Sequence, residues 1–224
     1  MSFAYASGNR LTLLRSGREY FPALEDAIRE ANREIFLEAY IYTEDETARR
    51  ITDALLGAAR RGVSVHVLVD GFGSRDLMSP DLGERLLFGG VKFLVYRPEV
   101  RAFRFSRQRL RRMHRKMAVM DARVGFVGGI NIIDDMNTPG QMPPRYDFAV
   151  RVEGPLVADI QEQVERLWSL VAWVNLHRRW RASHHQAHEA AQRGAQRAAL
   201  LVRDNLRHRS NIEDAYLEAM RDAR

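Results

Sequence analysis

The chain has 224 residues, of which 46% are hydrophobic and 29% are charged, so it is long enough to bury a substantial core and has a globular composition. Its 35 lysines and arginines outnumber its 29 acidic residues, giving a net charge of +6, which favours anionic partners. Cysteine is absent, which excludes a disulfide framework, a thiolate nucleophile and a cysteine-ligated metal.

Strand and helix patterns alternate along the first 180 residues. Runs rich in β-branched and aromatic residues predict strands, and apolar residues at helical spacing predict helices. In chain order we expect a helix at 18–33, a strand at 35–42, a helix at 43–61, a strand at 63–70, a helix at 80–88, strands at 91–96, 114–121, 124–128 and 146–152, and a helix from 154 to about 180. Alternation of this kind predicts an α/β fold with a mixed, mainly parallel central sheet.

The C-terminal part of the chain has a different composition. Residues 183–198 have no clear apolar face and are expected to form a linker. Beyond them, residues 203–224 repeat part of the N-terminal sequence at a constant offset of 188 positions, as in Arg15 and Arg203 or Glu25-Asp26-Ala27 and Glu213-Asp214-Ala215. Internal repetition reports on architecture. We therefore expect one complete unit at 1–182, followed at 183–224 by a linker and the truncated start of a second, repeated unit.

The segment HRKMAVMD followed by VGFVGGIN gathers the groups most suited to chemistry. His114 and Lys116 are two positions apart, so in an extended segment both side chains point to one face. An imidazole beside an ammonium is a natural site for a phosphate. Gly128 and Gly129 allow a close backbone approach, so the amide of Asn131 can reach the same anion.

A basic block precedes this segment. It contains eight cationic residues and no acid, namely Arg101, Arg104, Arg107, Arg109, Arg111, Arg112, Arg115 and Lys116. Such a block indicates a surface for nucleic acid or an anionic bilayer, and the alternative is a solvated loop. Because it leads directly into His114, we favour a role in binding, with Arg112 and Arg115 contacting the substrate.

The spacing H-x-K-x4-D-x6-G-G-x-N, with Asp121 as its acidic position, is similar to the HKD signature of the phospholipase D superfamily. The segments IFLEAYIYTED, VHVLVDGFGSR and DFAVRVEGP extend the likeness over nearly the whole chain. It is closest to the N-terminal half of bacterial cardiolipin synthases that lack transmembrane helices. The resemblance implies the α/β/α sandwich of that superfamily.

The resemblance also implies roles for individual residues. His114 would attack phosphorus and form a phosphohistidine, and Lys116 and Asn131 would hold the non-bridging oxygens. Asp147 stands where the family places the carboxylate that orients the histidine. The remaining expected site residues are Asp121, which would organise local hydrogen bonds, and Gly128, Gly129 and Glu38, which would line the substrate site. This chemistry needs no metal or other cofactor.

Three functions are consistent with these features. The first is phosphatidyl transfer between phospholipids such as phosphatidylglycerol, as in cardiolipin synthases. Because one histidine cannot be nucleophile and acid in one step, it needs a second HKD motif from a homodimer or a partner chain. The second function is that of a homodimeric nuclease or phosphodiesterase, since nucleic acid would also suit the basic block. The third is an inactive, truncated half that binds lipid.

Several further residues have two readings each. Tyr40 at a strand end could line the site, and Asp70 could cap the loop that follows its strand, or both could be ordinary polar residues at strand ends. Trp168, Trp173 and Trp180 could form a membrane-interface belt, although core packing is favoured for Trp168. His184, His185 and His188 could supply a metal pair, but their segment reads as linker.

No signal peptide or stretch of about 18 apolar residues is found. We therefore expect a cytoplasmic protein that is peripheral on the inner face of the cell membrane.

Overall fold

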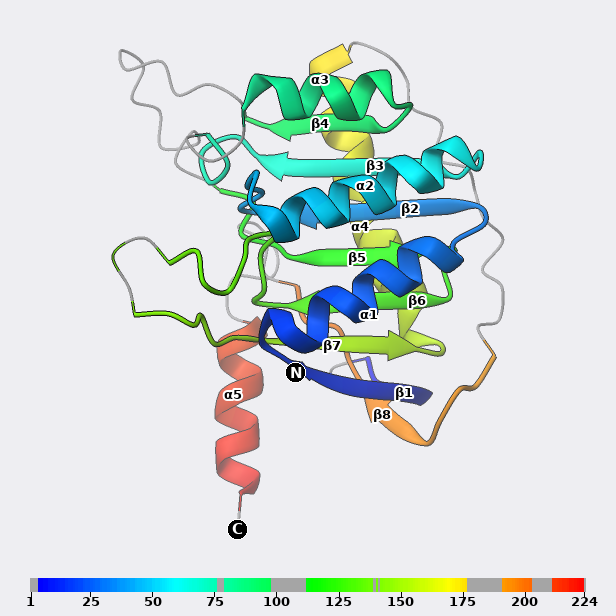
Figure 1. Ribbon diagram of the computed structural model, residues 1–224. Coiled ribbons are helices and arrows are strands. Elements are labelled where there is room, and N and C mark those ends of the chain that lie inside the picture. The colour runs from blue at the N-terminus through cyan, green and yellow to red at the C-terminus, as the bar shows by residue number, and fades with distance from the viewer. Residues whose placement is uncertain are drawn as a thin grey trace.

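An eight-stranded sheet lies between helices on both of its faces (Figure 1). The computed structural model describes residues 4–75, 79–97, 112–138, 140, 142–176, 191–202 and 211–223. Helices α1 (Ser16–Glu30), α2 (Glu46–Arg60) and α3 (Pro80–Phe88) cover one face, and α4 (Leu156–Leu176) covers the other. This arrangement confirms the expected α/β/α sandwich. No helix in the described part of the chain is both long and apolar enough to cross a membrane.

The strands follow the order β4-β3-β2-β5-β6-β7-β1-β8 across the sheet. Their bounds are β1 Ala6–Arg15, β2 Glu34–Ala39, β3 Ser64–Asp70, β4 Lys92–Tyr96, β5 Met117–Met120, β6 Val124–Gly128, β7 Phe148–Glu153 and β8 Gln196–Ala198. A last helix, α5 (Asn211–Asp222), follows β8.

The sheet is mixed, but the expectation that it is mainly parallel is wrong. Of the strand pairings in the described part of the chain, β2–β3 and β3–β4 are parallel and the other five are antiparallel. The reason is the connections, because parallel neighbours need a long crossover whereas antiparallel ones need only a turn. Helices α2 and α3 supply the two crossovers, while β5 and β6 are joined by the tight turn at 121–123.

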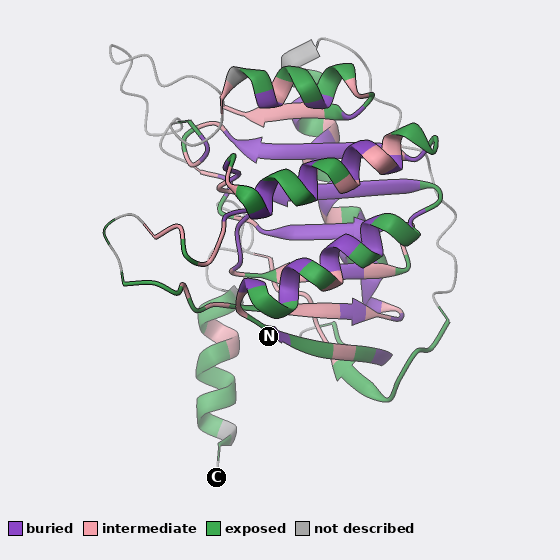
Figure 2. Ribbon diagram, viewed as in Figure 1, coloured by how far each residue is buried: buried purple, intermediate pink, exposed green. Residues whose placement is uncertain are grey.

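Two apolar cores lie on opposite faces of the sheet (Figure 2). Alternation along β2 sends Ile35 to the core under α1 and α2, and Phe36 to the core under α4. Trp168 of α4 is buried against the ring of His66, at 4.8 Å between centroids. Trp168 therefore packs in the core, as favoured from the sequence, whereas Trp173 is exposed and Trp180 lies outside the described residues.

Two strands were not expected from the sequence. β1 contains Gly8 and Asn9, which disfavour strands, yet it pairs along most of its length with β7. β8 falls inside the predicted linker 183–198, so that prediction is wrong for Gln196–Ala198, which pair with β1. The strand is polar because it lies at the exposed edge of the sheet, and apolar periodicity could not reveal it.

Most strands end or begin along one side of the sheet, at right angles to the edge formed by β8, and this side is called the site edge. The C-terminal ends of β2, β3, β4 and β6 lie there, beside the N-terminal ends of β5 and β7. This is the left-hand edge in Figure 1. The segments that leave these strand ends, among them the residues around His114 and Asn131, are thereby brought together.

The core under α1 and α2 generates a stability prediction. Phe126 is 1% exposed and meets the ring of Tyr20 edge-on at 5.9 Å between centroids. Phe126→Ala should lower the free energy of unfolding by about 3–5 kcal/mol, because it leaves a cavity as well as losing apolar contacts. Urea unfolding followed by circular dichroism measures the change. Phe88→Ala is the matched control, since Phe88 is 88% exposed and its loss should cost less than about 0.5 kcal/mol. Equal losses for the two variants would contradict the assigned core.

Candidate active site

His114 and Lys116 lie side by side just before β5. The Nζ of Lys116 is 3.0 Å from the Nε2 of His114, so the geometry expected from the sequence is confirmed. The imidazole is exposed, whereas Lys116 is only 6% exposed. When the ammonium donates to Nε2, the neutral imidazole carries its proton on Nδ1. That tautomer presents a nucleophilic nitrogen on the same side as a cation.

The ring of Tyr40 supports both groups from the end of β2. Its centroid lies 4.8 Å from that of His114 and 5.1 Å from the Nζ of Lys116. An ammonium over an aromatic face is stabilised by the quadrupole of the ring. Tyr40 is therefore part of the site, which was one of its two readings from the sequence.

The two glycines after β6 are required for space. A Cβ on Gly128 would overlap the backbone of Phe148 and Ala149, and a Cβ on Gly129 would overlap the carboxylate of Asp147. Neither glycine has a positive φ, so close approach rather than unusual backbone conformation explains them. Their absent side chains let the start of β7 bring Asp147 to the site edge.

Asn131 is fixed by the segment that follows Tyr40. The N–H of Ile41 donates to the Oδ1 of Asn131 at 3.0 Å, and the N–H of Ile132 donates to the carbonyl of Ile41 at 3.0 Å. With Oδ1 engaged, the Nδ2 group is the part of the amide that can donate to an anion. Asn131 thus joins the same edge of the sheet as Lys116.

The charged groups around the imidazole of His114 shift its pKa in opposite directions. Partial desolvation and, next, the cation of Lys116 lower the pKa of His114, while Asp70 and Asp147 act to raise it. Burial lowers the pKa of Lys116 to about 8, against the opposing influence of Asp147. The lowered pKa of His114 keeps the imidazole neutral at neutral pH, as a nucleophile requires.

Asp147 acts on both cationic groups through its charge. Its Oδ1 accepts a hydrogen bond from the N–H of Phe148 at 2.7 Å. No hydrogen bond joins it to His114 within the described ranges. Its orienting role therefore stays a prediction.

Asp121 does not lie with His114, so its expected place among the catalytic residues is wrong. β5 separates the two, and at about 3.3 Å per residue the strand carries Asp121 about 16 Å beyond Lys116. Its carboxylate accepts the N–H groups of Asn32, Arg33 and Glu34 at 2.8–2.9 Å. It does organise local hydrogen bonds, as interpreted from the sequence, but at the opposite edge of the sheet.

Glu38 and Arg115 lie together on the face covered by α4. Glu38 pairs with Met117 in the sheet, and Met117 packs in the core under α4. The Glu38 carboxylate is 4.0 Å from the Arg115 guanidinium and has no hydrogen bond in the described part of the chain. Burial raises the pKa of Glu38 to about 8, with Arg115 acting in the opposite direction. Neither forms an ion pair or hydrogen bond with Lys116, so their predicted substrate contacts stay a prediction.

The basic block is described only from Arg112 onward. The guanidinium of Arg112 lies over the ring of Phe72, 4.3 Å from its centroid. Phe72 belongs to the loop that follows β3. Residues 101–111 lie outside the described residues, as do His184, His185 and His188. Among the residues that the structure describes, no group of three or more potential ligands could hold a metal ion.

Known proteins that resemble this chain are found by its sequence and by its fold. Residues 24–168 match the family described as cardiolipin synthase, phospholipase D-like domain. The chain belongs to this family. It is 41% identical over 225 residues to cardiolipin synthase B of Escherichia coli K12 and 42% identical to that of Salmonella typhimurium.

These alignments cover all of this chain but 53% of each relative, so the chain spans about half the length of the curated relatives it matches. A solved member of the phospholipase D family, Nuc from Salmonella typhimurium, shares the fold. It superposes with a TM-score of 0.55 and 20% identity, over 71% of this chain and 94% of that chain.

The effect of Lys116 on the pKa of His114 can be tested by substitution. Lys116→Met should raise the pKa of His114, because it removes both a neighbouring cation and the hydrogen bond to the neutral Nε2. NMR titration of the histidine ring protons measures this shift. Lys92→Met is the matched control, because Lys92 acts on His66 instead and its loss should leave His114 unmoved. A fall in the pKa of His114 in the first variant would contradict the assignment.

Proposed function

We propose that this chain carries one half of an active site for phosphatidyl transfer between phospholipids, with phosphatidylglycerol as donor and acceptor. The buried ammonium of Lys116 beside the exposed imidazole of His114 carries the proposal. No carboxylate lies within ion-pair distance of Lys116 in the described ranges, so a phosphate supplies the missing negative charge. The likeness to cardiolipin synthase B over the full chain supports phospholipid as the substrate.

The reaction needs two displacements at one phosphorus. The Nε2 of His114 attacks the phosphorus of phosphatidylglycerol, a P–N bond forms, and the P–O bond to the glycerol headgroup breaks. The departing glycerol oxygen takes a proton from a general acid. A headgroup hydroxyl of a second phosphatidylglycerol then loses its proton to that group and attacks, which breaks the P–N bond. The products are cardiolipin and glycerol, and His114 is regenerated.

Lys116 and Asn131 would stabilise the phosphorane-like transition state. Both present hydrogen-bond donors at the same edge as His114, where they would stabilise the developing charge. Asp147 would hold the imidazolium character that develops as the P–N bond forms, through the charge interaction that it already has with His114.

The general acid must come from a second half-site, since His114 is already the nucleophile. The strand pair β1–β8 supports a twofold arrangement of the two halves. At the offset of 188 positions, Gln196 of β8 is the counterpart of Gly8 of β1, and it pairs with the next residue, Asn9. Equivalent strands that pair antiparallel are related by a local twofold axis. We infer that a second unit of this fold, in the same or another chain, faces the first across such an axis.

The direct test uses phosphatidylglycerol vesicles. The protein, alone and together with a chain that carries the second unit, should form cardiolipin and release an equal amount of glycerol. His114→Gln should lower the rate by at least about a thousandfold, as expected for the loss of a covalent nucleophile. Acid quenching followed by mass spectrometry should find a phosphatidyl group on His114. Absence of cardiolipin under every condition would rule out the transferase.

Nucleic acid is the second candidate substrate, favoured by the arginines that lead into His114. The same preparations should therefore be incubated with plasmid DNA in the presence of a chelator. Cleavage that His114→Gln abolishes, without cardiolipin formation, would assign the site to a nuclease.

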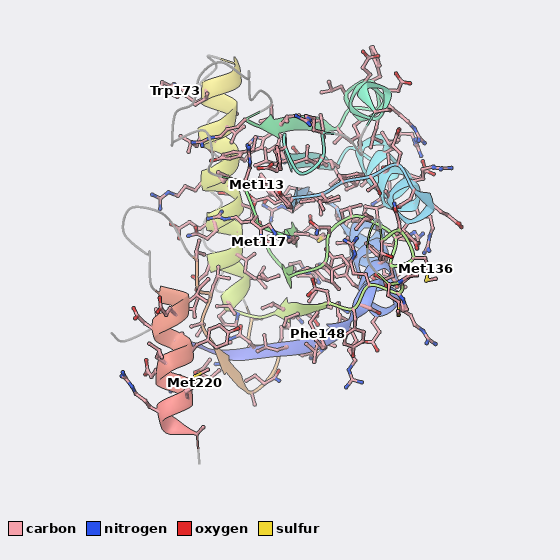
Figure 3. The ribbon with its side chains drawn as sticks, turned by 90° about the vertical axis from the view of Figure 1, so that its left-hand side faces the viewer. Met113, Met117, Met136, Phe148, Trp173 and Met220 are labelled. Atoms are coloured by element: carbon pink, nitrogen blue, oxygen red, sulfur yellow. The ribbon has the colours of Figure 1, made fainter. Side chains whose placement is uncertain are left out.

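The edge that carries His114 also exposes apolar side chains beside arginines. Figure 3 looks onto this edge, with Met136 and Phe148 labelled. Among the described residues, the exposed apolar side chains on the connections around the site and at the start of β7 include Phe72, Met136, Met142, Tyr146 and Phe148. Together with Arg112 and the basic block they favour a bilayer with anionic lipid. We infer that this edge faces the inner surface of the cell membrane as a peripheral contact.

Membrane contact can be tested by substitution of two exposed side chains. The double variant Met142→Ser, Tyr146→Ser should weaken binding to phosphatidylglycerol vesicles about tenfold, since each side chain buries apolar area in the bilayer. Co-sedimentation measures the binding. Phe88→Ser is the control, because Phe88 is exposed at the end of α3 away from the site edge. If this control lost as much affinity, the assigned face would be wrong.

A further inference from the structure

Asp70 is a buried carboxylate whose hydrogen bonds converge from two segments. It is the last residue of β3 and is 1% exposed. Its Oδ1 accepts the N–H groups of Phe72 and Gly73 at 2.9 and 3.0 Å. Its Oδ2 accepts the N–H of Met113 at 2.7 Å. The first pair confirms that Asp70 caps the loop after β3, but the bond to Met113 serves the residue immediately before His114.

The bond to Met113 fixes the backbone from which the proposed nucleophile projects. Met113 is itself buried in the core under α4, so its main chain is held by the carboxylate and its side chain by apolar packing. Figure 3 shows Met113 and Met117 between the sheet and α4. His114 and Lys116 therefore project from a segment whose two ends, Met113 and Met117, are buried in the core under α4, and Asp70 also holds the main chain of Met113.

The loop capped by Asp70 also supports the other side of the site. The N–H of Ser74 donates to the carbonyl of Asp70 at 3.1 Å, and the hydroxyl of Ser74 donates to the carbonyl of Tyr40 at 3.1 Å. Tyr40 in turn contacts both His114 and Lys116. Asp70 thus links the backbone before His114, through its carboxylate, to the loop that contacts the backbone of Tyr40, which it holds through both its carboxylate and its main-chain carbonyl.

The charge of Asp70 has no cationic partner within ion-pair distance among the described residues. Among the described residues, Lys116 and Tyr40 contact the imidazole of His114, and Asp70 and Asp147 act on it through their charges. Lys116 lowers the pKa of His114, while Asp70 and Asp147 raise it. Because Asp70 is buried, water screens its field less than it would screen that of a surface group.

We propose that Asp70 is a positioning residue for the transfer reaction, which holds the main chain before His114 and places a fixed negative charge near the imidazole. This inference rests on the proposed function for the role of His114 as nucleophile. A simple loop cap would share the hydrogen bonds to Phe72 and Gly73 but would leave the reacting imidazole unaffected.

Asp45 offers a matched control. It is also a loop carboxylate, and it accepts the N–H groups of Ala48 and Asp134 at 3.0 and 2.8 Å and the side-chain amide of Asn137 at 3.1 Å. Its charge is not among those that act on His114. Asp45→Asn and Asp70→Asn therefore disturb similar numbers of hydrogen bonds, and only the second touches the segment of His114.

The experiment measures the pKa of His114 by NMR and the transfer rate with phosphatidylglycerol vesicles, on the full chain with its second half-site. Asp70→Asn should lower the pKa of His114, because a negative neighbour is lost. It should also lower kcat by about tenfold to a hundredfold with little change in KM, as a misplaced catalytic group does. Asp45→Asn should change neither the pKa of His114 nor kcat.

A shared loss of activity in both variants, or an unmoved pKa of His114 in Asp70→Asn, would overturn the proposal. If Asp70→Asn does not fold, Asp70→Glu replaces it. The longer side chain keeps the charge but displaces Met113, so the pKa of His114 should stay near its original value while kcat falls. If the unaltered protein transfers no lipid, the proposed function fails, and the NMR arm alone decides whether Asp70 acts on His114.

Discussion

The burial of one ammonium group sets the character of the whole site. Lys116 is almost completely removed from water, and transferring a cation out of water is costly unless other groups compensate. Here the compensation consists of the face of Tyr40, the Nε2 of His114 and the more distant charge of Asp147. None of these is an ion pair, so the site remains short of one negative charge. A bound phosphate is the group that would complete it, and the lowered pKa of Lys116 expresses the same deficit.

The carboxylates in the described part of the structure do not form ion pairs with Lys116, because each has another partner or position. The carboxylate of Asp70 is occupied by backbone N–H groups, Glu38 lies on the other face of the sheet, and Asp121 lies at the opposite edge. Side-chain alternation in the segment 114–117 separates the two environments, because His114 and Lys116 point one way and Arg115 points the other. The strand geometry, rather than the composition of the segment, keeps cation and anion apart.

The sequence predicted the elements that have strong apolar patterns and the part of the site that lies within one short segment. The proximity of His114 and Lys116 follows from two-residue alternation and needs no tertiary information. β1 and β8 could not be predicted, because Gly8, Asn9 and the polar residues of β8 give no strand pattern in the sequence. These segments become strands through backbone pairing with β7 and with each other. The antiparallel majority of the sheet was missed because helix–strand alternation describes only β2 to β4. Asp121 shows the limit of a motif, since sequence neighbours on a strand can lie at opposite edges of the sheet.

The exposure of His114 bears on the need for a second half-site. Lys116 is buried, with the ring of Tyr40 next to its Nζ, yet the imidazole beside it is exposed. A nucleophile that relied on this unit alone would react in contact with bulk water, where hydrolysis competes with transfer to a lipid hydroxyl. Closing that side requires a surface that carries both the general acid and the means to exclude water. A second unit related to the first by the axis between β1 and β8 would bring an equivalent edge, with its own imidazole, and so would meet both requirements with the same residues.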